Sequence, residues 1–176
     1  MAVKVEFVSP TSEHLPALCQ IYAAAFKPLP YNKTAGESQS FSIGFERMTQ
    51  REDFRMVLAL HDDRPIGFAY GYHLKPEYGW HAVLGPPLEQ AELGHWLEDA
   101  FCLAEMALRP GFWGKGIGGN LHDKLLSDLP YKHQLLSTMQ DDSTNGYKLY
   151  LKRGWHNLLE DIWVSEVERA YRVMGR

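Results

Sequence analysis

The chain is poor in cysteine and has no long apolar run. Its 176 residues include two cysteines, Cys19 and Cys102, each in an apolar stretch, so we expect two buried thiols and neither a disulfide framework nor a zinc site. No apolar segment is long enough to span a bilayer. The first residues alternate like a strand and lack the apolar core of a signal peptide. These absences favour a cytoplasmic protein without a membrane partner.

An excess of basic residues is also missing. The formal net charge is −4 and the pI is about 6.0, whereas nucleic-acid-binding domains are usually basic, so we expect no nucleic-acid partner. The eight histidines show no spacing typical of a metal site, so no metal is expected, and His122 is expected at the surface. Hydrophobic residues make up 45% of the chain, an ordinary share that favours one globular domain over residues 1–176.

The apolar periodicity predicts an α/β order of elements. Strands are expected at residues 3–7, 56–60, 65–74, 100–108, 134–139, 155–164 and 170–174. Helices are expected at residues 15–25, 37–51, 117–126 and 144–152. Thr11 or Ser12 is expected to cap the first helix, Ser143 or Thr144 to cap the last, and Gly154 to end the last. Residues 61–64 are typical of a hairpin turn, and residues 75–98 of a long loop with a short helix.

Residues 106–119 combine a strand end, a short turn, a run of glycines and a helix start. Glycine allows backbone N–H groups to approach a ligand closely, and a helix N-terminus carries a partial positive charge. Together these features predict a site for an anion, most often a phosphate or pyrophosphate.

Gly114, Gly116 and Gly119 also match the dinucleotide pattern G-x-G-x-x-G, and Asp141 and Asp142 follow about 20 residues on, where a ribose-binding acid would fall. An NAD-dependent oxidoreductase of the Rossmann type is therefore one alternative. Against it, residues 109–113 separate the glycines from the strand, and too few residues follow to complete a doubly wound sheet. A nucleoside triphosphate loop is excluded because no Gly-Lys-Ser/Thr follows.

Residues 108–118 read Leu-Arg-Pro-Gly-Phe-Trp-Gly-Lys-Gly-Ile-Gly, and residues 143–155 read Ser-Thr-Asn-Gly-Tyr-Lys-Leu-Tyr-Leu-Lys-Arg-Gly-Trp. Their order and separation resemble two motifs of the GNAT-type N-acetyltransferase superfamily. Trp113 stands where that family has Arg or Gln, and Ser143 where it has Asn. The resemblance implies a single-domain α/β fold with a mixed, largely antiparallel sheet of about seven strands. Helices would flank this sheet, and a splayed strand pair would hold the cofactor.

The resemblance also implies direct transfer of an acetyl group from acetyl-coenzyme A to a primary amine of a small molecule or peptide. Backbone amides of Met106, Ala107 and Leu108 would polarise the thioester carbonyl, and Ser143 or Asn145 would bond the pantetheine arm. The pyrophosphate would be held by the glycine loop, which comprises Trp113, Gly114, Lys115, Gly116, Ile117, Gly118 and Gly119. Family members often form homodimers. A catalytically silent, regulatory domain that binds coenzyme A is a further alternative.

Two residues are candidates for proton transfer. Glu105 lies in an apolar strand beside the expected thioester site, where an acid is costly unless it faces a cleft or has a partner. It is the expected base, with Glu98 and Asp99 as alternatives, and a structural ion pair is the competing explanation. Tyr150 occupies the family's tyrosine position, so the resemblance implies that it protonates the leaving thiolate. Core packing is the alternative role of Tyr150.

The resemblance places acceptor recognition between the first two helices and on the strands that face them. Phe26, Tyr31 and Tyr72 are the aromatic candidates for substrate binding. Such rings would suit a small amphipathic or planar amine, and packing in the core or in a dimer is the alternative explanation for each.

Overall fold

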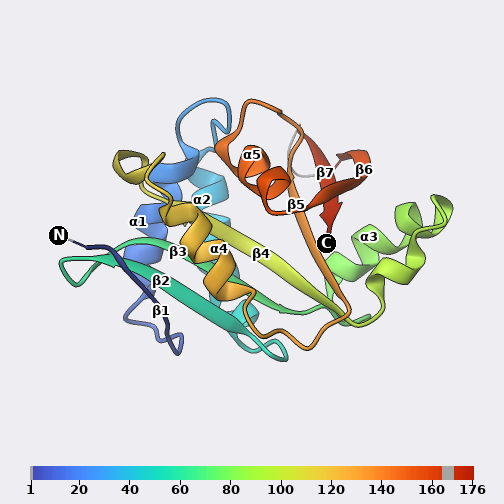
Figure 1. Cartoon of the computed structure of the whole chain (residues 1–176), viewed down its shortest axis with the longest axis horizontal. Helices are drawn as coiled ribbons and strands as arrows, with labels where there is room; N and C mark the ends of the chain where they lie inside the picture. Colours follow the sequence, from blue (N-terminus) through green and yellow to red (C-terminus); the bar gives the residue numbers. More distant parts are fainter. Residues whose placement is uncertain (1, 164–168) are drawn as a thin grey trace. The chain divides into compact units, whose positions relative to one another are not determined.

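The computed structural model describes residues 2–163 and 169–176 (Figure 1). Its strands are β1 (Lys4–Phe7), β2 (Arg55–His61), β3 (Arg64–His73), β4 (Ala100–Leu108), β5 (His133–Met139), β6 (His156–Trp163) and β7 (Ala170–Gly175). Its helices are α1 (Leu15–Phe26), α2 (Ala35–Thr49), α3 (Gly79–Gln90), α4 (Ile117–Leu125) and α5 (Asn145–Lys152), with the 3-10 turns η1 (Gly94–Leu97) and η2 (Pro110–Phe112). None of these described helices has the length and apolarity needed to cross a membrane.

The seven strands form one mixed sheet in the order β1-β2-β3-β4-β5-β7-β6. The pairs β1–β2, β2–β3, β5–β7 and β6–β7 are antiparallel, and β4–β5 is parallel. This architecture confirms the mixed, largely antiparallel α/β fold implied by the motifs. The chain forms two compact units, one of residues 1–72 and 104–128 and the other of residues 73–103 and 129–176.

In the first unit, β2 and β3 form a hairpin closed by a two-residue turn. His61 pairs with Arg64, and Asp62 and Asp63 between them have φ angles of 50° and 58°. Positive φ at both central residues is the type I′ arrangement, whose twist matches that of the flanking strands. The hairpin predicted at residues 61–64 is confirmed.

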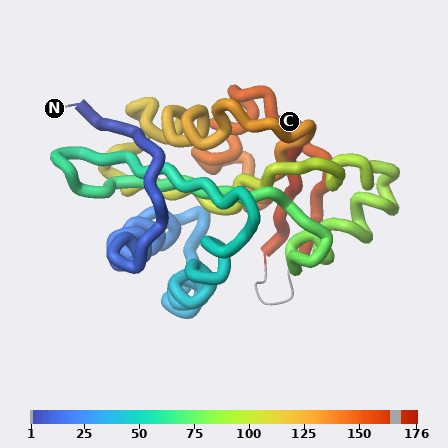
Figure 2. The backbone as a smooth tube through the Cα atoms, turned by 90° about the horizontal axis from the view of Figure 1, so that it is seen from below, coloured from blue at the N-terminus to red at the C-terminus, as the bar shows by residue number. Residues whose placement is uncertain are grey.

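Helices cover both faces of the strands in the first unit. Figure 2 shows α1 and α2 below β2 and β3, and α4 above them. An aromatic core fills the lower layer: the rings of Tyr22 and Phe41 stack with centroids 4.3 Å apart, and the centroid of Phe41 lies 5.7 Å from that of Phe68. A capping box between Thr34 and Glu37 starts α2 and so fixes where the loop from α1 ends.

The start of α1 differs from the prediction. Its N-cap residue is His14, which makes no side-chain cap, so neither Thr11 nor Ser12 has that role. A proline in the first turn helps to start the helix without a side-chain cap. Its φ is already helical, and its absent N–H would have had no intrahelical partner.

Gly67 on β3 allows the end of β4 and helix α4 to come close. A Cβ atom on Gly67 would lie 2.7 Å from Cδ1 of Leu108, 3.0 Å from the carbonyl oxygen of Ala107 and 3.1 Å from Cδ1 of Leu121. A larger residue would push these neighbours apart, because close-packed interiors have no spare volume. This packing fixes both ends of the segment that joins β4 to α4.

The burial of α4 is wider than its apolar stripe predicts. His122, expected at the surface, is fully buried on this helix, like Leu121 and Leu125. Its Nδ1 atom lies 2.7 Å from Oδ1 of Asp123, which gives the imidazole a polar partner. The two cysteines follow the prediction more closely, since both are free thiols, Cys102 buried and Cys19 half-buried.

The second unit contains a longer helix than the sequence predicts. α3 covers 12 residues and includes Pro86 and Pro87, so the long loop expected at residues 75–98 is largely helical. The Gly-Pro-Pro run is normally a stop signal, because each proline removes a backbone donor. Here Leu84 and Leu88 are completely buried, and their packing outweighs that loss.

The α5 helix begins and ends as predicted. Thr144 Oγ1 accepts a hydrogen bond from the Tyr147 amide at 3.3 Å, and Gly154, with a φ of 80°, follows the last turn. Arg172 on β7 holds the segment before the helix: its Nη2 donates to Oδ1 of Asp142 at 2.7 Å, and its guanidinium lies 3.9 Å from the ring centroid of Tyr147.

Candidate functional site

The glycine loop connects β4 to α4 through two left-handed residues. Gly114 and Gly116 have φ angles of 74° and 79°, a region that residues with a side chain rarely adopt. A Cβ atom on either glycine would meet nothing within 4 Å, so the loop borders open space. Gly116 is the N-cap of α4, and the first N–H groups of a helix have no intrahelical partner. The predicted strand, turn, glycine loop and helix start are therefore present, in a form suited to an anion.

Two side chains of the loop donate hydrogen bonds to the backbone just before it. Nε1 of Trp113 donates a hydrogen bond to the carbonyl oxygen of Leu108 at 2.7 Å. Nζ of Lys115 donates to the carbonyl oxygen of Gly111 at 3.0 Å and lies 5.3 Å from the ring centroid of Phe112. These hydrogen bonds hold the residues just before the glycines, and the glycine amides themselves take no part in them.

At the end of β4, the N–H and C=O groups of successive residues face opposite edges of the strand. The amide of Arg109 donates to the carbonyl oxygen of Ile66 on β3 at 2.9 Å. Strand alternation then directs Ala107 toward β3 and directs the peptide groups of Met106 and Leu108 to the opposite edge. Within the described residues, β4 pairs with β5 from Ala100 to Cys102, at the beginning of β4. The Met106 amide is a hydrogen-bond partner of the Glu105 carboxyl, so Leu108 is the predicted amide donor whose direction suits a ligand.

Glu105 and Ala107 lie on the same face of β4. Ala107 belongs to the aromatic core that packs against α1 and α2. Glu105 is half-buried. Burial raises the pKa of the Glu105 carboxyl above its usual value, while the Lys33 ammonium and the Met106 backbone act less strongly in the opposite direction. Glu105 is consequently a stronger base than an exposed glutamate.

Lys33, which sequence analysis did not single out, occupies an aromatic setting in the same unit. Its Nζ donates to the Tyr22 hydroxyl at 2.6 Å and lies 4.5 Å and 4.2 Å from the ring centroids of Tyr22 and Phe26. The Tyr31 ring meets Phe26 edge to face, with centroids 5.0 Å apart. Two predicted acceptor residues, Phe26 and Tyr31, therefore belong to a group that already holds a primary ammonium.

The third predicted acceptor residue, Tyr72, has a different environment. Its side chain is 2% exposed, and the Arg51 guanidinium lies 4.2 Å from its ring centroid. Burial of this extent favours the core-packing explanation for Tyr72.

The second motif lies in the second unit. Ser143 and Asn145 are exposed on either side of the buried cap Thr144. The Ser143 amide donates to Oδ1 of Asp141 at 2.8 Å, so this turn is fixed before α5 begins. Tyr150 on α5 is 7% exposed, and its ring centroid lies 6.0 Å from that of Trp155. Its ring is thus packed, as the core alternative also expects.

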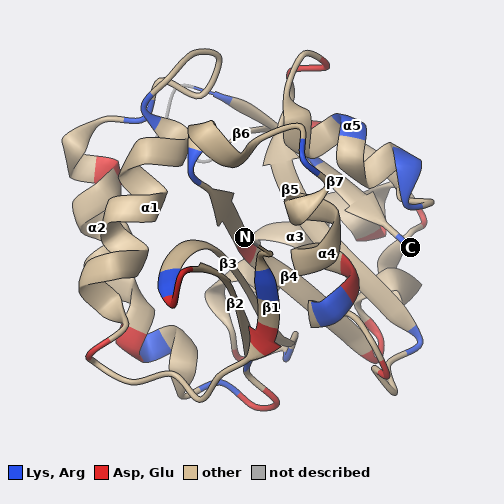
Figure 3. Cartoon of the chain, turned by 60° about the vertical axis from the view of Figure 1, so that its left-hand side comes forward, with Lys and Arg blue, Asp and Glu red and all other residues tan. Residues whose placement is uncertain are grey.

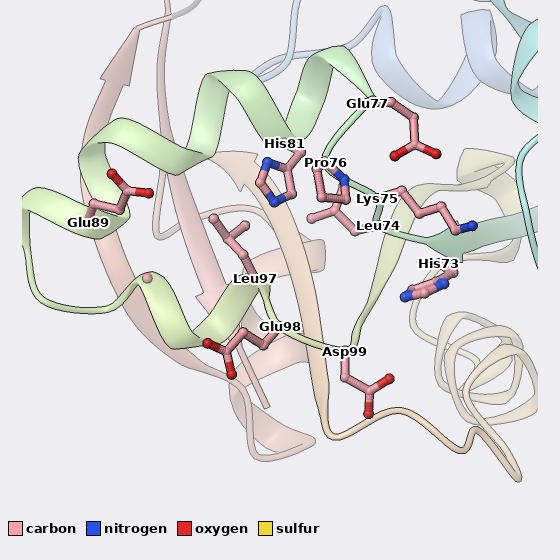
Figure 4. A pocket seen from close by; sticks show the side chains of 11 residues that line it. His73, Leu74, Lys75, Pro76, Glu77, His81, Glu89, Leu97, Glu98 and Asp99 are labelled. Carbon is pink, nitrogen blue, oxygen red and sulfur yellow. The ribbon is translucent and has the colours of Figure 1, made fainter.

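The alternative acids, Glu98 and Asp99, border a cavity of the second unit (Figure 4). This cavity has a volume of about 550 Å³ and begins beside the N-terminal end of β4. The carboxylate of Asp99 accepts a hydrogen bond from the Lys132 amide at 3.1 Å. Both of these acids are exposed, unlike Glu105.

A family model and a curated relative both describe acetyltransferases. The model of the Acetyltransferase (GNAT) family matches residues 15–155. The chain is 29% identical over 121 residues to the GCN5-like protein acetyltransferase Rv2170 of Mycobacterium tuberculosis, an alignment that covers 63% of this chain and 57% of that protein. The chain thus spans little more than half the length of this curated relative.

Solved structures share the fold at low sequence identity. The PaiA N-acetyltransferase of Thermoplasma acidophilum in complex with coenzyme A matches with a TM-score of 0.67 and 17% identity, covering 100% of this chain and 99% of that one. The ribosomal-protein-alanine N-acetyltransferase of Brucella melitensis matches with a TM-score of 0.67 and 15% identity, again covering 100% and 99%. These two likenesses concern the fold alone.

Proposed function

Since the chain belongs to the Acetyltransferase (GNAT) family, a family of acyltransferases, we propose that it transfers an acetyl group from acetyl-coenzyme A to a primary amine of a small molecule or peptide. The observation that carries this proposal is the glycine loop, in which two left-handed glycines lead into the N-terminus of α4. Family membership also accounts for the G-x-G-x-x-G spacing without a dinucleotide.

The loop would bind the pyrophosphate of the cosubstrate. Amides from Gly114 to Gly119 supply hydrogen bonds, and the partial positive charge of α4 attracts the anion. The amide of Leu108 would bind the oxygen of the thioester, with a benefit on the order of 3 kcal/mol for a well-aimed donor at a developing oxyanion. Ser143 and Asn145 would bond the pantetheine arm, on the strength of the second motif.

Acetyl transfer needs an amine that has lost its proton. The Glu105 carboxylate would take that proton, since burial makes it a stronger base. The amine nitrogen would then bond to the thioester carbonyl carbon, and the bond between that carbon and sulfur would break. The proton for the leaving thiolate would come from the Tyr150 hydroxyl, a role that its position in the second motif supports.

The acceptor side would contact the amine through aromatic rings. The ring centroids of Tyr22 and Phe26 lie within 4.5 Å of the Lys33 ammonium, which would repel a second cation, so an uncharged amine suits this setting better than an ammonium. Tyr31 extends the same aromatic group. Tyr72 would contribute only indirectly, through packing.

Turnover on a defined amine panel tests the proposal. Purified protein and acetyl-coenzyme A would be offered an aliphatic diamine, a peptide with a free N-terminal alanine, and an N-terminally blocked peptide with one lysine. We expect release of free thiol together with one added acetyl group on at least one acceptor, detected by mass spectrometry. Binding of acetyl-coenzyme A without turnover on any amine would instead support a silent regulatory domain, and binding of NAD alone would contradict the proposal.

Partners and location remain predictions. Figure 3 shows Lys and Arg interspersed with Asp and Glu along the described chain, and the net charge of −4 supports the proposed lack of a nucleic-acid partner. We further propose action in the cytoplasm, without a membrane or metal requirement, as a homodimer. Light scattering at several protein concentrations would test the dimer.

A further inference from the structure

The carbonyl group at the last residue of β4 is bound by a side chain. Nε1 of Trp113 donates to the carbonyl oxygen of Leu108 at 2.7 Å in partly buried surroundings. Between them, the Phe112 amide donates to Arg109 and the Trp113 amide to Pro110, at 3.0 Å and 3.1 Å. Residues 108–113 are therefore closed by three hydrogen bonds immediately before the first left-handed glycine.

The direction of the Leu108 carbonyl explains why this bond matters. The Arg109 amide donates to Ile66 on β3, so the carbonyl of Leu108, in the same peptide group, faces the opposite edge of β4. Recorded pairing with β5 ends at Cys102, well before Leu108. The indole N–H thus supplies a partner on an edge where the described strand pairing does not.

We propose that Trp113 is a positioning residue for the cosubstrate: its indole hydrogen bond fixes the end of β4 relative to Gly114 and so orders the glycine loop before coenzyme A binds. This inference rests on the proposed function. Trp113 is also the residue at which the chain departs from the Arg or Gln of the family motif. The departure therefore replaces a flexible polar side chain with a tether inside the protein.

The Trp113 hydrogen bond lowers the entropic cost of ordering the glycine loop when coenzyme A binds. Gly114 and Gly116 are the least restricted residues of the loop, and each segment that is immobilised by a ligand reduces the affinity. Trp113 holds the start of the loop, and the first turn of α4 holds its end. The hydrogen bond from Lys115 to Gly111 narrows the conformations between them.

The Trp113→Phe variant removes the donor and keeps an aromatic ring. Titration calorimetry with coenzyme A should show a dissociation constant about tenfold higher, which corresponds to about 1.4 kcal/mol. The KM for acetyl-coenzyme A should rise in parallel, while kcat at saturating cosubstrate stays unchanged. Trp163→Phe is the matched control, because Trp163 is 65% exposed on β6 of the second unit, and it should match wild type.

A second measurement needs no cosubstrate. In ligand-free protein, hydrogen exchange of the amides at residues 114–119 should be faster in Trp113→Phe than in wild type or Trp163→Phe, with an unchanged thermal midpoint. Equal affinities and equal exchange in wild type and Trp113→Phe would overturn the inference. Failure of wild type to bind coenzyme A would overturn the proposed function, whereas the exchange rates would still decide whether Trp113 orders the loop.

Discussion

Replacing Gly116 by alanine isolates the contribution of its left-handed backbone. Gly116 has a φ of 79°, and an added Cβ atom would meet nothing within 4 Å. The substitution therefore introduces no clash and costs only the strain of that conformation, about 1–2 kcal/mol. If the loop needs this conformation to bind coenzyme A, the dissociation constant should rise about 5- to 30-fold.

Gly111→Ala is the matched control, in η2 just before the loop. Its Cβ atom also meets nothing within 4 Å, and Gly111 has no positive φ. Calorimetry with coenzyme A should therefore show wild-type affinity for Gly111→Ala and weakened binding for Gly116→Ala. Equal affinities for the two variants would refute the reasoning, because strain at Gly116 would then have no bearing on the ligand.

Three further predictions follow from the same unit and from α5. Lys33→Met should move the acidic limb of the kcat/KM profile to higher pH, because the Lys33 ammonium lowers the pKa of Glu105 and its removal lets that pKa rise. An unmoved limb would exclude Glu105 as the titrating base. Tyr150→Phe should lower kcat on the order of 100-fold while the KM for acetyl-coenzyme A is kept, a loss typical of a general acid; wild-type turnover would remove Tyr150 from that role. Gly67→Ala should lower the thermal midpoint by several degrees in a melting experiment, because the new Cβ atom would lie 3.0 Å from the Ala107 carbonyl oxygen, and overpacking typically costs about 1–3 kcal/mol; an unchanged midpoint would show that β4 relaxes without cost.

The raised pKa of Glu105 also links stability to pH. A carboxyl whose pKa is higher in the folded state than in the unfolded state binds its proton more tightly when folded. Its stabilising contribution is complete below the unfolded pKa and is lost as the pH rises through the folded pKa. The Glu105 carboxyl therefore stabilises the fold less at neutral pH than in acid.

Local chemistry made much of the fold predictable. Two consecutive aspartates between alternating strands identified the turn at Asp62 and Asp63, because few residues adopt positive φ. The left-handed glycines of the loop were predictable for the same reason, and the α5 cap because only Ser143 and Thr144 offered a capping hydroxyl there. Each of these features depends on residues within a few positions of one another.

Features that depend on distant residues were not predictable from one sequence. The charge of Lys33 acts on Glu105 across 72 positions of the chain, and no pattern in the sequence links the two. His122 is buried because of what packs around α4, and α3 continues through Pro86 and Pro87 because its leucines are buried. In each case tertiary packing overrides a local preference.

A crystal structure with coenzyme A bound tests the central claim most directly. The account predicts pyrophosphate oxygens within hydrogen-bonding distance of backbone amides between Gly114 and Gly119, with the Trp113 indole still bound to Leu108. Coenzyme A bound elsewhere, with these amides turned away from its phosphates, would contradict it.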